Sequence, residues 1–179
     1  MGRAGAGAII PFSSGLPLAL STIAGGLVGT VGVVGFGNSA PSLTGLGGVI
    51  DLTGSPGELL NFAFTMPRAG TITSIVATFS TLVELALPAT TVTIRAELYR
   101  SVTPTSNVFV PTGAIVTLTP SLTGVIVGPG TVSSGMNSGL DIPVAAGDRL
   151  LLVFSATAAG AAPIIEALVG YTSAGVNII

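Results

Sequence analysis

Apolar and polar residues alternate with a period of two along much of this 179-residue chain, and that period restricts it to β-structure. In the clearest run, 92–99, every even position is apolar and the odd positions hold Thr, Arg, Glu and Tyr. Such a run is typical of an antiparallel strand with one buried and one solvated face. Further strands are expected at 60–66, 72–82, 115–119, 122–127, 148–156, 164–169 and 171–179, with glycine and proline between them. The pattern predicts an all-β antiparallel sandwich or barrel.

Charged residues are scarce: five arginines and seven acids make up 7% of the chain, whereas 49% of its residues are hydrophobic. Small soluble domains carry charge at roughly 25–35% of their surface positions. The run 150–154 has no polar face at all, so a strand there must be covered on both sides. We therefore expect other subunits to cover the apolar excess, and a homo-oligomer rather than a lone monomer.

The side chains that carry most enzyme chemistry are missing. The chain has no histidine, cysteine or lysine, which removes Ser-His and Cys-His nucleophiles, thiolate metal sites and Schiff bases. We expect no catalysis, no cofactor and no metal ion. A net charge of −2 with scattered arginines predicts that the protein binds no nucleic acid.

One uncharged stretch, residues 16–36, is long enough to cross a bilayer. It contains five glycines, each of which costs about 1 kcal/mol in a helix, and it lacks flanking aromatic and cationic anchors. We therefore predict no membrane span.

Three local patterns look like binding sites, and a structural role explains each of them better. Residues 35–40 fit a glycine-rich dinucleotide pattern, but no helix follows, so we predict a turn. Asp141 and Asp148 are too few for a calcium site, so we expect a structural turn in which Asp148 hydrogen-bonds its own loop. Arg95 and Glu97 are expected on an ordinary solvated strand face shared with Tyr99.

The order of several motifs resembles a known family. The motifs are GAIIPFSSG at 7–15, LSTIAGGLVGTVGVVGFG at 20–37, IDLTG at 50–54, NFAFTMPRAGTITSI at 61–75, DRLLLVFSATAAG at 148–160 and GYTSAGVNI at 170–178. Together they resemble, over nearly the whole chain, the C-terminal domain of the collagen-like exosporium glycoproteins of Bacillus-type spores, the BclB-like group. Such heads are similar to complement-globular-head and tumour-necrosis-factor domains. The resemblance implies a homotrimeric jelly-roll sandwich on the spore surface.

Members of that family carry a Gly-X-Y collagen stalk before this domain. Here residues 2–6 are its only trace, so we expect a head without a stalk. The expected organisation is an extended N-terminal arm at 1–19 and a jelly-roll trimerisation domain at 20–179.

The N-terminal arm has the sharpest functional expectation. Its large apolar residues are predicted to dock on the next trimer as an inter-trimer connector made of Ile9, Ile10, Pro11 and Phe12. A flexible spacer is predicted to follow at Ser13, Ser14 and Gly15. The alternative is that residues 9–12 are simply the first strand of their own domain.

These expectations favour a structural subunit of a spore-surface fibre or endospore appendage, with trimers joined head to tail through the arm. The expected partners are further copies of the chain and other exosporium proteins at the base or tip of the fibre. The alternative is a trimeric adhesin head that recognises a carbohydrate or a host protein. The absence of tryptophan and the presence of only two tyrosines favour the structural role.

Overall fold

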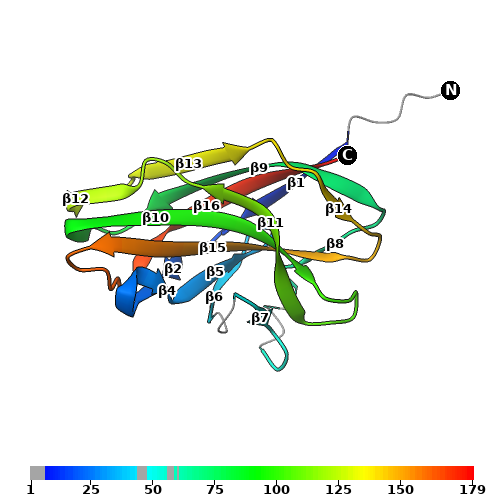
Figure 1. Cartoon of the computed structure of the whole chain (residues 1–179), viewed down its shortest axis with the longest axis horizontal. Coiled ribbons are helices and arrows are strands. Elements are labelled where there is room, and N and C mark those ends of the chain that lie inside the picture. The colour runs from blue at the N-terminus through cyan, green and yellow to red at the C-terminus, as the bar shows by residue number, and fades with distance from the viewer. Residues whose placement is uncertain (1–6, 44–47, 56–58, 60) are drawn as a thin grey trace.

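The computed structural model describes residues 7–43, 48–55, 59 and 61–179, and their regular structure is almost entirely β-strand (Figure 1). One 3-10 turn, η1 (Ala24–Gly26), lies among the strands. In chain order the strands are β1 (Ala8–Ser13), β2 (Leu18–Leu20), β3 (Thr22–Ile23), β4 (Leu27–Val28), β5 (Thr30–Val34), β6 (Ser39–Leu43), β7 (Ile50–Asp51), β8 (Phe64–Thr65), β9 (Gly70–Thr81), β10 (Leu85–Ser101), β11 (Val108–Thr117), β12 (Leu122–Val127), β13 (Val132–Asn137), β14 (Ile142–Val144), β15 (Arg149–Gly160) and β16 (Leu168–Ile178).

The strands pair in a nested order. The first strand, β1, pairs with the last, β16; β5 pairs with β15, β9 with β13, and β10 with β11 and β12, all antiparallel. A long hairpin rolled up on itself gives this nesting, which is the arrangement of a jelly roll. The predicted all-β antiparallel jelly-roll sandwich is therefore confirmed.

Two sheets face each other across the core (Figure 1). The six-stranded sheet has the order β1-β16-β9-β13, with β2 beside β16 and β14 beside β9. The eight-stranded sheet has the order β6-β5-β15-β10-β11-β7, with β12 beside β10 and β8 beside β15. The uncharged stretch 16–36 folds into the strands β2 to β5. Within the described ranges, no helix is long and apolar enough to cross a bilayer.

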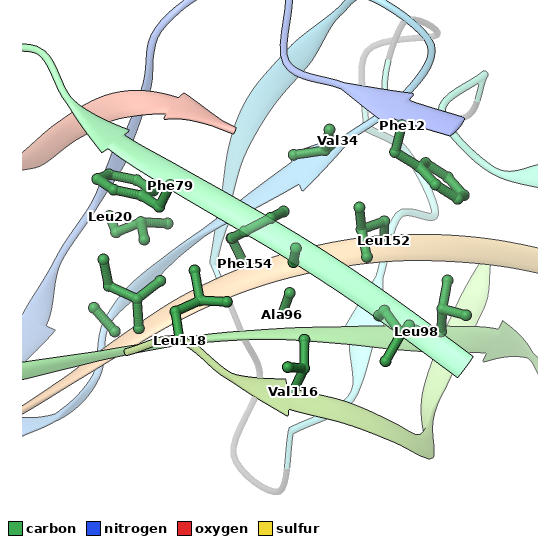
Figure 2. Packing of buried hydrophobic residues seen from close by; sticks show 14 of the residues in the cluster. Phe12, Leu20, Val34, Phe79, Ala96, Leu98, Val116, Leu118, Leu152 and Phe154 are labelled. Carbon is green, nitrogen blue, oxygen red and sulfur yellow. The ribbon is translucent and has the colours of Figure 1, made fainter. Parts of the chain in front are cut away.

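The main core lies between the two sheets. The side chains at the four even positions of the run 92–99 are at most 1% exposed there, as the alternation predicts. Phe79 of the six-stranded sheet and Phe154 of the eight-stranded sheet lie in the same core as Leu98 (Figure 2). Burying a side chain of this size contributes about 1.5–3 kcal/mol, so this layer is the main source of stability.

Strand β15 is covered on both faces. Alternate residues of the run 150–154 point into the main core and into a second apolar cluster on the opposite face of the eight-stranded sheet. Ile50, Leu52 and Phe62 of the same chain belong to that second cluster. The expectation that another subunit covers this run is therefore wrong, because the segment around β7 already does so.

The N-terminal segment is part of the sandwich, which corrects the predicted domain boundary at residue 20. β1 pairs with β16 along its whole length, and its Ile10 and Phe12 are only 6% and 3% exposed, in the main core. Residues 8–19 therefore belong to the jelly roll, and the alternative of a first strand is confirmed. Residues 1–6 of the predicted arm lie outside the described residues.

The spacer predicted at 13–15 is held in place. The Ser14 N–H donates to the carbonyl of Thr172 at 3.0 Å, and the Ser14 hydroxyl accepts from the Thr172 N–H at 3.1 Å. Gly15 has a φ of +61°, and a Cβ there would collide with the carbonyl oxygen of Gly37. Glycine is needed here for a close backbone approach rather than for flexibility, so the prediction of a flexible spacer is wrong.

Candidate functional site

The acidic turn before β15 is structural. The Asp148 carboxylate accepts the Ala145 N–H at 2.9 Å and lies 3.6 Å from the Arg100 guanidinium. The prediction that Asp148 hydrogen-bonds its own loop is therefore confirmed. Across the described part of the chain, no three His, Cys, Asp or Glu side chains group closely enough to hold a metal ion.

Residues 35–38 form a tight turn between β5 and β6, and residues 39 and 40 begin β6. The Gly35 N–H donates to the carbonyl of Asn38 at 2.9 Å, and the Asn38 side-chain oxygen accepts the Phe36 N–H at 3.2 Å. Two antiparallel strands flank the turn, so it provides no helix N-terminus for a pyrophosphate. The predicted turn is confirmed.

The polar face of β10 is only partly solvated. Arg95 is exposed, whereas Glu97 is half-buried and accepts the Gly113 N–H at 3.2 Å. Burial raises the pKa of Glu97 above its usual range, and this effect outweighs the Gly113 hydrogen bond and the charge of Arg95. Tyr99 is 8% exposed within the second cluster, and burial likewise raises its pKa. The expectation of a solvated face holds for Arg95 and fails for Tyr99.

The outer face of the six-stranded sheet is the most distinctive surface of the molecule. None of the six strands β1, β2, β9, β13, β14 and β16 contains a charged residue. The strands of the eight-stranded sheet, by contrast, contain Asp51, Arg95, Glu97, Arg100 and Arg149. Because alternate residues of each strand fill the core, the residues between them point outward, away from the second sheet. We call this surface the uncharged face.

Large apolar side chains are exposed on the uncharged face. Their exposed fractions are 76% for Ile9, 68% for Met136, 50% for Val132, 44% for Tyr171 and 42% for Val76. Several large apolar side chains exposed on one face usually mark a contact with a partner.

The register of the strands sorts the uncharged face into rows. One row crosses four strands as Pro11, Gly175, Val76 and Met136. The next row consists of hydroxyl side chains: Ser13, Ser173, Thr78 and Ser134. An apolar row beside a hydroxyl row can pack against a second flat surface and also form hydrogen bonds that fix its register. The sequence contains every one of these residues, but only the pairing of distant strands brings them side by side.

Comparison with known proteins gives one close match. No family model matches the chain. Over 182 aligned residues, however, it is 36% identical to "Collagen-like protein 1" of Acanthamoeba polyphaga mimivirus, and the match covers 99% of this chain. The chain spans only 19% of the length of that protein. This chain is thus similar, along nearly its whole length, to a domain-sized part of a collagen-like protein.

Proposed function

We propose that this chain is a structural, self-assembling subunit whose uncharged face forms the contact between the copies of a homotrimer. The observation that carries the proposal is that six adjoining strands contain no charge while Ile9, Val76 and Met136 stand exposed on them. A protein surface in permanent contact with water normally carries charges of both signs. A surface that is buried between copies does not need them.

The size of the uncharged face supports this role. β16 has 11 residues, so the face is about 36 Å long, and its four principal strands make it about 19 Å wide. The resulting area of about 700 Å² is of the same order as the roughly 800 Å² that a protein buries against one partner in a standard interface, and in a ring of three it would be shared between two neighbours. The resemblance to trimeric jelly-roll heads supplies the number of copies, and a closed ring of three satisfies every interface.

The biological setting is a finer part of the same proposal. Resemblance to exosporium glycoproteins supports a fibre or appendage on the spore surface, and the name of the mimivirus protein supports a place in a collagen-like structural assembly. Further copies of the chain are the expected partners, with other exosporium proteins at the base or tip of the fibre. A connector at Ile9–Phe12 is not part of the proposal, because Ile10 and Phe12 lie in the core of their own subunit.

An aspartate placed on the uncharged face tests the trimer. Val76 and Met136 are directly opposite each other on β9 and β13, so the double variant Val76→Asp, Met136→Asp puts two carboxylates at its centre. Val102→Asp is the matched control, because Val102 is 53% exposed and lies outside this sheet. Native mass spectrometry at micromolar concentration should show trimers for the wild type and the control, and monomers for the double variant. Monomers of wild-type protein, or trimers of the double variant, would refute the proposal.

The adhesin alternative has one observation in its favour. A shallow cleft of about 200 Å³ lies beside Pro11, Phe12 and Phe36, and Phe36 is 51% exposed. A carbohydrate can stack on such a ring, but specific sites also need several placed polar groups. Among the residues that line the cleft, only Ser13 has a polar side chain. The structural role is therefore the better supported of the two.

A further inference from the structure

The two ends of the sandwich have complementary surfaces, and we propose that they form the contact between successive copies along a fibre. An apolar tip at one end, made of Ile23, Leu27 and Ile164, docks into an apolar slot at the opposite end of the next copy. The slot is defined by Ile10, Phe64, Met66, Ile178 and Arg68. This inference rests on the proposed structural function and adds to it the surface through which one trimer stacks on another.

The tip is a rigidly held hairpin. Ile23 of β3 stands opposite Leu27 of β4, and their side chains are 52% and 62% exposed. The neighbouring Thr22 fixes the hairpin to the adjacent loop, since its N–H donates to the carbonyl of Ile165 at 2.9 Å and its hydroxyl accepts the Ile165 N–H at 2.8 Å. Ile164 of that loop is 59% exposed. A fixed apolar projection loses little conformational entropy when it docks.

The slot is a small apolar hollow. It has a volume of about 50 Å³, and apart from Arg68 all of its lining residues are apolar. That volume suits the branched end of one isoleucine or leucine side chain. Burying such a group in an apolar hollow is favourable, whereas leaving both tip and slot in water is not.

The tip and the slot lie at opposite ends of β16. Residue Leu168, at the start of β16, pairs with Leu20 just before the tip, and Ile178, at its end, pairs with Ala8 beside the slot. The 11 residues of β16 separate the two by about 36 Å. In Figure 1 the β4 end lies at the opposite side of the sandwich from the end where β1 begins and β16 stops. One subunit therefore cannot fill its own slot, and a contact between tip and slot joins copies head to tail.

The charges at the two ends also favour head-to-tail contacts between copies. Glu84 and Glu166 are exposed at the tip end, and the described segments around them, 16–36, 81–92 and 156–168, contain no arginine. The slot includes the exposed Arg68. Of the two acids near that end, Asp148 is paired with Arg100 at 3.6 Å, and Asp141 is exposed just before β14. Two tip ends facing each other would oppose acid with acid, whereas tip against slot brings acid toward Arg68.

A second copy of this chain suits the tip better than a membrane does. Protein segments that insert at a lipid surface combine apolar residues with lysine, arginine, tryptophan or tyrosine. The tip has none of these, and the charged residue nearest to it in the sequence is the acidic Glu166, two positions after Ile164. The test below also measures binding of the tip to lipid vesicles, which would contradict docking on another copy.

The first test changes the tip alone. Leu27→Asp should leave trimers intact and raise the concentration needed for trimers to associate further by about tenfold or more, as measured by sedimentation and by fibre length in electron microscopy. Val102→Asp makes the same change at a similarly exposed residue that belongs to neither the tip nor the slot, and it should behave as the wild type. Normal fibres from Leu27→Asp would overturn the tip contact alone. The same holds if the wild type binds phosphatidylcholine vesicles through the tip and Leu27→Asp abolishes that binding together with the association. Wild-type trimers that never associate further would overturn both the fibre and this contact.

A second test asks whether the tip and slot meet directly. The chain has no cysteine, so Ile23→Cys combined with Arg68→Cys introduces the only thiols. Mild oxidation should give a ladder of covalently linked chains on non-reducing gels, because each chain then carries one thiol at each end. Val102→Cys with Arg68→Cys is the control and should give no ladder.

A charge swap tests the same contact without new thiols. Arg68→Glu should shorten fibres, and adding Glu166→Arg should restore them. Absence of both the ladder and the rescue would refute the contact.

Discussion

Truncating Phe12 tests whether β1 is an integral strand of the folded sandwich. The Phe12 side chain is 3% exposed, and its ring lies 5.2 Å from the ring of Phe36, with 28° between the planes. Phe→Ala in a core usually costs about 3–5 kcal/mol. Phe36 is itself half-exposed, so water can reach part of the space that the missing ring leaves. We therefore expect Phe12→Ala to lower the free energy of unfolding by about 3 kcal/mol.

The measurement is guanidinium denaturation at one fixed protomer concentration, because association adds to apparent stability. Val102→Ala is the control: Val102 is 53% exposed and lies outside the uncharged face, so its truncation should cost about 0.5 kcal/mol or less. The double variant with Phe36→Ala should show a coupling of about 0.5–1.5 kcal/mol from the stacked rings. If Phe12→Ala were as stable as Val102→Ala, β1 would not be packed into the sandwich at all.

A disulfide reports whether β1 belongs to its own subunit or to its neighbour. Ser13 lies opposite Ser173, and both its backbone groups bond outward to Gly35 and Gly37, so the pair makes no hydrogen bonds across the ladder. Such pairs bring two Cα atoms to about 4.5 Å, within the range for a disulfide. Ser13→Cys with Ser173→Cys should therefore close a bond inside one chain. Oxidised dimers and ladders would instead show that β1 is exchanged between subunits.

Three further predictions concern stability. Thr172 is buried and its hydroxyl has no hydrogen-bond partner in the described part of the chain, so Thr172→Val should be neutral or stabilising by roughly 1 kcal/mol in thermal denaturation. A Cβ at Gly135 would lie 2.5 Å from the carbonyl oxygen of Thr117, so Gly135→Ala should destabilise by about 1–3 kcal/mol; unchanged stability would mean that β13 and β11 are not this close. Burial raises the pKa of Glu97 above 4.5, so its ionised form opposes folding and stability falls as pH rises through the folded-state pKa. Glu97→Gln should therefore be more stable than the wild type at pH 7 and lose that advantage below about pH 4.

Local patterns in the sequence predicted the interior better than the surface. The alternation at 92–99 placed its apolar side in the core, and the unbroken apolar run at 150–154 is indeed covered on both faces. The strand expected at 60–66 is reduced to Phe64–Thr65, because Phe62 turns toward the second cluster instead. What local patterns do not contain is the identity of the covering segment. Residues around β7, and not another subunit, cover β15.

Long-range pairing explains the other differences. β1 pairs with β16, more than 150 residues away at the far end of the chain. Nothing in the sequence of either segment predicts that the two strands pair. A glycine- and alanine-rich start therefore looks like a free arm when it is taken alone. The rows of the uncharged face have the same origin, since Ser13, Ser173, Thr78 and Ser134 are neighbours only after the hairpin has rolled up.

The edges of the two sheets favour the proposed contacts through faces and ends over the addition of strands from another chain. An exposed edge strand offers unpaired N–H and C=O groups to any other chain. Here β1, β6 and β14, at the edges of the two sheets, contain Pro11, Pro41 and Pro143, each of which removes a donor. β12 is interrupted by register shifts around Gly124, whose φ is +125°. A chain with so little charge is prone to uncontrolled edge pairing, and these interruptions oppose it while they leave the uncharged face and the tip free. Specific association then depends on side-chain shape at those two surfaces, which is what an ordered fibre requires and an amorphous aggregate does not.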